Sequence, residues 1–360
     1  MGVEVCVPPT TNVAAKSGRA DSSAQAAILP EGPGRPPQPG QSRVIAKRRK
    51  QQIYWSLAHY FSEFVRIRSP REFAEWIYYK YPSAFPLRDF PSKLTLEITN
   101  ECNFGCPHCP RNELNAERGL GFMDMAVFRK IAAEGAGRVT TAKFIGLGEP
   151  SLHPHLPEML GLLLQNGIKS IVYTNGTLLE RFEPEDIASW GLEVIVLSID
   201  GLDERSFNRL RVGGDYQSIR NRLAAFRRWR DDHGAKTPHV EIRHVIMPNE
   251  TPAGLNAFRD DWLEGGGDSV KFNVLGPHYD ERRKEDPNRP PCRDIRREIH
   301  VRYDGRVPMC GYDGQRQWLG DLRQATLQQV WRSVTLEEVR AKHARRDLSS
   351  LPFCRTCQFR

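Results

Sequence analysis

The chain has 360 residues, of which 27% are charged, and its formal net charge is +8 at pH 7. This length supports one large domain with an ample core and a second, small domain. No stretch of about eighteen residues is apolar enough for a membrane span, and the N-terminus lacks a basic-then-apolar signal pattern, so we expect a cytoplasmic protein without a membrane partner. The surplus arginines follow a helical pattern without interleaved aromatics, which argues against a nucleic-acid partner.

The N-terminal part of the chain predicts two segments. Residues 1–42 are rich in Pro, Gly, Ser and Ala and predict a disordered tail. Residues 43–92 predict a helical extension, with aromatic-rich helices at 53–64 and 73–81.

From residue 93 onward, strand and helix patterns alternate. The predicted strands cover 93–99, 142–150, 170–173, 193–199, 240–247 (taken as the sixth strand of the sheet) and 270–275. The predicted helices include 124–133, 156–166, which stops at Gly167, and 184–189. This alternation predicts βαβ units around a parallel sheet, in which ligands bind at the carboxyl ends of the strands.

Three cysteines follow the first predicted strand directly. Cys102, Cys106 and Cys109 stand in the spacing C-x3-C-x2-C. Three thiolates on one loop can hold three corners of a [4Fe–4S] cluster and leave one iron open to bind a small molecule. A zinc site is the alternative, but zinc usually takes four ligands as two separated pairs, and His108 is poorly placed as the fourth.

This spacing resembles the signature of the radical S-adenosylmethionine (SAM) superfamily. The resemblance covers residues 93 to 275 and implies a partial (β/α)6 TIM-like barrel that cleaves SAM to a 5′-deoxyadenosyl radical. It also implies SAM contacts at other strand ends. Gly146, Gly148 and Glu149 match the glycine–glutamate motif that holds the SAM amino group, with Leu147 as a departure from its usual second glycine.

Further expected SAM contacts follow from the same resemblance. Asn175 lies in a Thr-Asn-Gly match to the third strand end, and Ser198 and Asp200 lie in a match to the fifth, facing the SAM ribose and methionine. His108 occupies the slot beside the adenine, where we expect it to pack and not to act as an acid or base.

Four more cysteines lie near the end of the chain: Cys292, Cys310, Cys354 and Cys357. Between them we expect a hairpin at 299–309 that turns at Asp-Gly, a loop at 320–322 and a helix at 326–339. Four thiolates from separate elements predict a closed metal site that staples a small domain. Zinc suits such a site as well as an iron–sulfur cluster does, whereas a disulfide is disfavoured in a reducing compartment.

This second set resembles the twitch domain, the one-cluster form of the SPASM extension of radical SAM enzymes. The resemblance implies a barrel at 93–285 and an α+β domain at 286–360 that holds an auxiliary [4Fe–4S] cluster. It also implies a flavodoxin- or ferredoxin-type electron donor. The sequence does not indicate an oligomeric state.

The order and spacing of the second set resemble those of twitch-type dehydrogenases of aminoglycoside biosynthesis, such as deoxy-scyllo-inosamine dehydrogenase. We therefore expect an oxidoreductase that converts a secondary alcohol of a sugar or cyclitol, a small-molecule substrate, to a ketone. Glu241 and Arg243 share one face of their strand and are candidate catalytic residues, whereas His244 points to the opposite face. His278 and Tyr279 have weaker support.

Three other functions remain open. Peptide modification is common among SPASM-type relatives, although residues 43–92 lack the strands of a winged-helix recognition domain. A sugar epimerase would need a hydrogen donor such as a free cysteine, and only Cys6 is left over. A non-enzymatic electron carrier would have no use for the glycine–glutamate motif.

Overall fold

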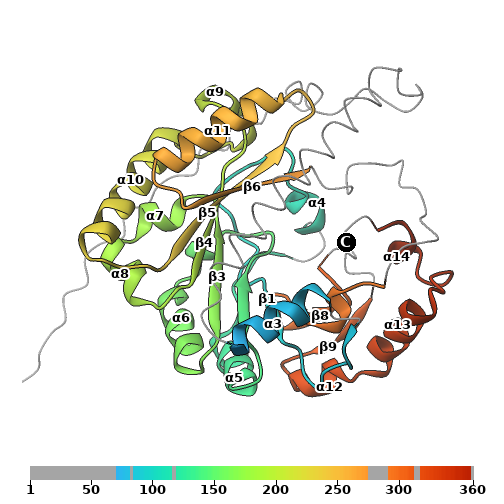
Figure 1. The fold of residues 1–360 in the computed structure, drawn as a ribbon. Helices are drawn as coiled ribbons and strands as arrows, with labels where there is room; N and C mark the ends of the chain where they lie inside the picture. The colour runs from blue at the N-terminus through green and yellow to red at the C-terminus, as the bar shows by residue number, and fades with distance from the viewer. Residues whose placement is uncertain (1–69, 82–83, 116–118, 275–290, 312–316, 358–360) are drawn as a thin grey trace, which may run out of the picture. The chain divides into compact units, whose positions relative to one another are not determined.

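A seven-stranded, all-parallel sheet organises the protein (Figure 1). The computed structural model describes residues 70–81, 84–115, 119–274, 291–311 and 317–357. The strands lie in the order β6-β5-β4-β3-β2-β1-β7. Their bounds are β1 Lys93–Leu96, β2 Thr141–Phe144, β3 Lys169–Thr174, β4 Val194–Ser198, β5 His239–Ile246, β6 Ser269–Val274 and β7 Glu298–Val301. The predicted α/β class with a partial barrel is therefore confirmed.

The numbering of two strands needs correction. The segment that carries Glu241 and Arg243 is β5, the fifth strand of the sheet and not the sixth. Ser198 accordingly ends the fourth strand and not the fifth. The miscount leaves the motifs at the carboxyl ends of parallel strands, because every neighbouring pair in the sheet is parallel.

Helices connect the strands and cover one face of the sheet. Up to the sixth strand, the helices among the described residues are α3 Pro70–Lys80, α4 Arg111–Asn115, α5 Met125–Gly135, η2 Pro150–Leu152, α6 Leu156–Gln165, α7 Thr177–Arg181, α8 Pro184–Ser189, α9 Glu204–Leu210, α10 Tyr216–Asp232 and α11 Pro252–Glu264. Among the described residues, no helix is long and apolar enough to cross a membrane.

Local signals explain where these helices begin and end. The Asp124 carboxylate accepts a hydrogen bond of 2.6 Å from the Ala126 N–H, which caps α5. Gly167 follows α6 with φ of +68°, as expected for a residue that ends a helix. The helices predicted at 124–133, 156–166 and 184–189 are confirmed to within two residues.

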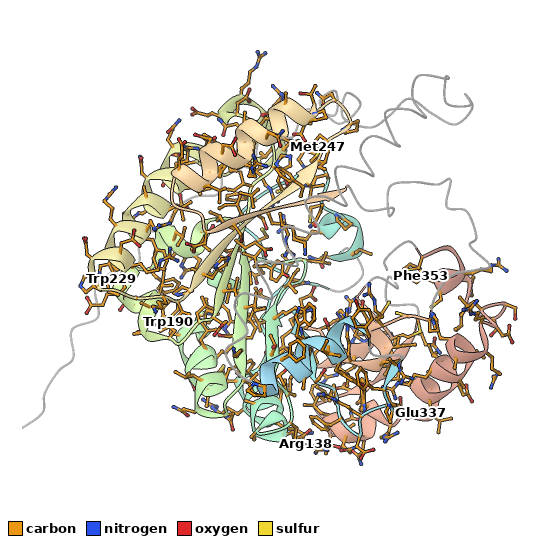
Figure 2. The ribbon with its side chains drawn as sticks, in the orientation of Figure 1. Arg138, Trp190, Trp229, Met247, Glu337 and Phe353 are labelled. Atoms are coloured by element: carbon orange, nitrogen blue, oxygen red, sulfur yellow. The ribbon has the colours of Figure 1, made fainter. Side chains whose placement is uncertain are left out.

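The main core lies between the sheet and these helices. Large side chains from both layers are fully buried there, among them Phe128, Phe144, Phe207, Phe226 and Trp262. Figure 2 shows side chains filling this layer, with Trp190 and Trp229 on its helical side. The core fixes the helices against one face of the sheet and leaves the opposite face for polar side chains.

The C-terminal part departs from the prediction. The remaining elements are η4 Asp294–Arg296, β8 Arg306–Pro308, β9 Trp318–Asp321, α12 Leu327–Trp331, α13 Val334–Arg345 and α14 Pro352–Thr356. The expected turn exists, because the Gly305 N–H donates to the Arg302 carbonyl over 2.9 Å. Its two arms, however, do not form one hairpin: β7 pairs with β1 of the main sheet, and β8 pairs with β9.

Two further expectations for this region were wrong. The expected loop at 320–322 is partly strand, because Gly320 and Asp321 belong to β9. The expected helix at 326–339 is two helices, because the Ser333 hydroxyl accepts from the Leu336 N–H and starts α13 anew.

The N-terminal extension is described only from residue 70 onward. There α3 confirms the second predicted helix, and the Tyr78 hydroxyl donates to the Arg296 carbonyl over 3.0 Å. The tail at 1–42 and the helix expected at 53–64 lie outside the described residues.

Candidate active site

The first cysteine set lies on the loop that follows β1. Burial raises the pKa of the Cys102 and Cys106 thiols, and the neighbouring Cys109 thiol raises both further. The three thiols therefore lie within range of one another's charge. Within the described ranges, no three Cys, His, Asp or Glu side chains already stand at metal-coordinating distances.

Hydrogen-bond donors surround the sulfur atoms of this loop. The Phe104 N–H lies 3.5 Å from the Cys102 Sγ, and the Asn175 amide nitrogen lies 3.8 Å from the same atom. The Arg211 Nη1 lies 3.9 Å from the Cys106 Sγ. Donors aimed at sulfur stabilise thiolates and are a common outer shell of iron–sulfur sites. The residues present thus fit a cluster held by three cysteines.

The glycine–glutamate motif is pressed against the start of the cysteine loop. A Cβ at Gly148 would lie 2.3 Å from the Thr99 carbonyl oxygen, so no larger residue fits there. The Glu149 N–H donates to the Glu101 carbonyl over 2.7 Å, and Gly146 lies directly against the Glu97 side chain. The motif and the cysteine loop therefore form one structural unit.

The Glu149 carboxylate is buried and bonded to the protein itself. It accepts hydrogen bonds from the Ser151 N–H at 3.1 Å, the Thr174 hydroxyl at 2.9 Å and the Asn175 N–H at 2.7 Å. Burial raises its pKa, and these donors oppose that rise. Glu149 thus joins the ends of β2 and β3; its expected contact with the SAM amino group stays a prediction.

Asn175 connects the end of β3 to the cysteine loop. Its amide nitrogen donates to the Asn103 Oδ1 over 3.0 Å, and its amide oxygen accepts from the Thr177 N–H over 3.0 Å. The side chain is therefore fixed from both sides beside Cys102.

Asp200 lies at the centre of a charged network beyond the end of β4. Its Oδ2 lies 2.6 Å from the Arg211 Nη2 and 3.0 Å from the His108 Nε2, and its Oδ1 accepts from the Val245 N–H over 2.8 Å. Although burial opposes the charge, Arg211 and His108 hold the pKa of Asp200 well below its usual range. This carboxylate therefore contacts the cysteine loop through His108; the SAM contacts expected of Asp200, His108 and Ser198 stay predictions.

The two candidate catalytic residues form an ion pair on the sheet face away from the helices. The Arg243 guanidinium binds the Glu241 carboxylate through Nε at 3.1 Å and through Nη2, and its Nη1 lies 3.0 Å from the Tyr173 hydroxyl. Although burial opposes the charge, Tyr173 and Glu241 raise the pKa of Arg243 above its ordinary value. His244 faces the other way, as predicted, and packs against the Phe258 ring of α11.

The sequence reasoning missed Tyr173 and a second polar group on the same face. The Lys143 Nζ of β2 lies 2.8 Å from a Glu298 carboxylate oxygen of β7, and the Thr95 hydroxyl donates to the same carboxylate. Although burial opposes the charge, Lys143 and His300 hold the pKa of Glu298 well below its usual range. The polar residues at odd-numbered positions of β1 and β2, Thr95 and Lys143, could have indicated part of this group. Glu298 could not be included because the pairing of β7 with β1 was not predicted.

The second cysteine set comes from separate elements. Cys292 precedes η4, Cys310 follows β8, Cys354 lies in α14 and Cys357 ends that helix. Burial raises the pKa of the Cys292 thiol, and the charges of Asp294 and Cys357 add to the rise, so Cys357 lies near Cys292. The Cys292 N–H also donates to the His343 Nδ1 over 3.3 Å. His278 and Tyr279 lie outside the described residues.

Comparisons with known proteins match two separate stretches of the chain. Residues 96–261 match the radical SAM superfamily, and residues 292–358 match the iron–sulfur cluster-binding SPASM domain. The chain therefore carries a radical SAM domain followed by a SPASM-type domain. Together these domains imply SAM and two [4Fe–4S] clusters as cofactors.

Individual relatives match only part of their length. A GTP 3′,8-cyclase of Yersinia pestis is 30% identical over 189 residues, which are 51% of this chain and 54% of the relative. A tungsten-containing aldehyde ferredoxin oxidoreductase cofactor-modifying protein of Pyrococcus furiosus is 28% identical over 187 residues, 51% of each chain. The chain thus spans about half the length of the curated relatives it matches.

A solved structure supports the fold alone. Streptococcus suis SuiB bound to the precursor peptide SuiA aligns with a TM-score of 0.58 at 16% identity and covers 76% of this chain and 73% of its own. This likeness confirms the architecture and carries no information on the substrate.

Proposed function

We propose that the protein is a radical SAM oxidoreductase that converts a secondary alcohol of a sugar, cyclitol or similar small molecule to a ketone. The observation that supports this most is the group formed by Tyr173, Arg243 and Glu241. It places a carboxylate, a guanidinium and a phenol on the sheet face away from the helices. The strands that carry these residues, β3 and β5, flank the strand that leads to Asp200.

The charges on this face favour a neutral, hydroxyl-rich substrate. Arg243 is paired with Glu241, and Lys143 is paired with Glu298. Because the charges of these two pairs cancel, the pairs add no net attraction for an anionic substrate, whereas carboxylates and hydroxyls suit hydrogen bonds to alcohol groups.

Glu241 and Arg243, which form an ion pair on β5, have different proposed roles. Glu241 accepts the hydroxyl proton as the carbinol carbon becomes a carbonyl carbon. Arg243 keeps the Glu241 carboxylate ionised and in place, since a guanidinium stays charged throughout the reaction. The bound cofactors supply the rest of the chemistry, namely the 5′-deoxyadenosyl radical that removes the carbinol hydrogen and a cluster that accepts the remaining electron.

The test is an anaerobic assay with SAM, a reductant and a panel of carbinol-deuterated sugars and cyclitols. We expect ketone together with deuterium in 5′-deoxyadenosine. Glu241→Gln should lower the ketone yield by about 10²-fold or more, in the range for loss of a general base. Glu250→Gln is the matched control, because Glu250 bonds to His244 on the opposite face of β5.

Other results would overturn the proposal. If 5′-deoxyadenosine takes up deuterium from a deuterated peptide and from none of the carbinols, the protein is a peptide-modifying enzyme. A sugar whose configuration changes without net oxidation would make it an epimerase. Equal ketone yields from the Glu241→Gln and Glu250→Gln variants would remove Glu241 from the mechanism.

A further inference from the structure

The turn between α9 and α10 lies on the cysteine loop. The Gly105 N–H, between two of the cysteines, donates to the Val212 carbonyl over 2.8 Å. Gly213 has φ of +99°, and a Cβ there would lie 3.0 Å from the Asn103 carbonyl oxygen. Residues 211–214 are therefore shaped to lie directly against the loop between Cys102 and Cys106.

Arg211 begins this turn and brings a positive charge to the cysteine sulfurs. Its side chain is only 14% exposed, and its Nη1 lies 3.9 Å from the Cys106 Sγ. A second nitrogen of the same guanidinium lies 2.6 Å from the Asp200 carboxylate, whose side chain is fully buried. The cation therefore lies between one cysteine sulfur and one carboxylate in a site of low solvent exposure.

We propose that Arg211 and Asp200 together set the reduction potential of the cluster held by Cys102, Cys106 and Cys109. Reduction adds one electron, supplied by a flavodoxin- or ferredoxin-type donor, and so adds one negative charge beside Cys106. The Arg211 charge stabilises that added charge, and Asp200 weakens the stabilisation. Because charges act strongly over short distances in a poorly solvated site, both effects reach the cluster.

The two substitutions should shift the reduction potential of the cluster in opposite directions, and this distinguishes a role in setting the potential from a role in supporting the loop. Removing the Arg211 charge should make the cluster harder to reduce, and removing the Asp200 charge should make it easier to reduce. A residue that only held the loop in place would change cluster occupancy without shifting the potential in two opposite directions. This role requires Cys106 to be a cluster ligand and is independent of the substrate that is oxidised.

The experiment uses the full chain with both clusters reconstituted anaerobically. A reductive titration is followed by electron paramagnetic resonance, and the SAM cluster is identified as the signal that changes when SAM is added. Arg211→Met should lower the ratio of reduced to oxidised cluster at a fixed potential by tenfold or more, equivalent to a shift of about 59 mV for one electron. Arg211→Lys, which keeps the positive charge, should lower this ratio by less than Arg211→Met does. Asp200→Asn should raise the ratio.

Arg209→Met is the matched control. Arg209 lies two residues earlier in α9, is exposed, and its loss changes the net charge equally. It should leave the ratio unchanged.

The outcomes are decisive even where a variant binds less iron. If Arg211→Met loses the SAM-responsive signal, a raised ratio in Asp200→Asn supports the proposal, and an unchanged or lowered ratio overturns it. Loss of the cluster from both variants shows that the turn only supports the loop, which also overturns it. An Arg211→Met variant that binds the normal amount of iron and has an unchanged ratio of reduced to oxidised cluster also overturns the proposal.

Discussion

The two cysteine sets are built in opposite ways. The first lies within residues 102–109, on one loop whose sulfurs receive donors from Phe104, Asn175 and Arg211. The second is spread over residues 292–357 and draws on η4, β8 and α14. A loop held by hydrogen bonds within itself and from neighbouring elements can keep its shape without metal, whereas a site assembled from short, distant elements gains much of its order from the metal. The comparison predicts a cysteine loop that keeps its shape without metal and a second cysteine site that depends on its cluster.

The strongest test of the comparison removes the first set. Anaerobically reconstituted protein should hold about eight iron and eight sulfide per chain. Replacing Cys102, Cys106 and Cys109 by Ala should remove about half of both and abolish SAM cleavage, measured as 5′-deoxyadenosine. Because the second set lies on other elements, its cluster should remain. Loss of both clusters would show that the two sites are not independent.

Removing the second site should separate SAM cleavage from product formation. Cys357→Ser should abolish the second cluster, since it removes one of the four cysteines expected to hold it. We expect 5′-deoxyadenosine to form as before and ketone to be nearly lost, with a lower melting temperature for the C-terminal domain. Cys6→Ser, outside both sets, is the control. Ketone that still matches 5′-deoxyadenosine without the cluster would make that cluster structural.

The stability of the barrel without metal can be tested through a buried ion pair. Arg230 binds Asp268 through two hydrogen bonds of 2.6 and 2.7 Å, and its side chain is 6% exposed. Asp268→Asn should lower the free energy of unfolding by about 3 kcal/mol at pH 7, because it removes the charge partner of a buried cation. Chemical denaturation of the metal-free protein measures the change.

An exposed pair provides the control, and pH provides a second readout. Arg220 pairs with Asp261 in the same two-bond manner, but Asp261 is 53% exposed, so Asp261→Asn should cost at most about 1 kcal/mol. Although burial opposes the charge, Arg230 holds the pKa of Asp268 below its ordinary value. The stabilisation by Asp268 is therefore present above the unfolded pKa of about 3.9 and is lost as the pH falls toward the folded value. Asp268→Asn should remove that acid dependence; an unchanged acid slope would contradict the assignment.

The smallest expected change concerns Glu149. Glu149→Gln keeps one acceptor oxygen but turns an amide group toward N–H donors, so stability should fall by about 1–2 kcal/mol. If the carboxylate also receives the SAM ammonium, SAM binding should weaken by about 1.5–3 kcal/mol, measured by calorimetry. Glu158→Gln, at a 42% exposed site, is the control. A loss of stability with unchanged SAM affinity would restrict Glu149 to joining β2 and β3.

Local signals predicted the barrel and its strand ends well. The cysteine loop, the glycine–glutamate motif and Asp200 all follow strands whose patterns are visible in the sequence, because each depends on neighbouring residues. Arg211 was placed only in a helical run of arginines, although the Val-Gly-Gly that follows it signals a turn. Its contacts with Asp200 and Cys106 arise from folding over distant positions, which no local pattern specifies.

The C-terminal domain was predicted less well for the same reason. The turn at Gly305 was found, but the strand before it pairs with β1 across more than two hundred positions. Short strands such as β8 and β9 carry too few residues to choose their partners by pattern alone. Ser333 could have indicated the break between α12 and α13, because serine often starts a helix.

The pairing of β7 with β1 also limits how the two domains can be separated. A shortened chain that stopped at residue 285, the expected end of the barrel, would lack β7 and expose the backbone of Lys93–Leu96 along the sheet edge. An uncovered edge strand invites pairing between chains, so such a fragment should aggregate. The C-terminal part of the chain therefore contributes a strand that protects the edge of the main sheet, so the sheet is complete only when both parts of the chain are present.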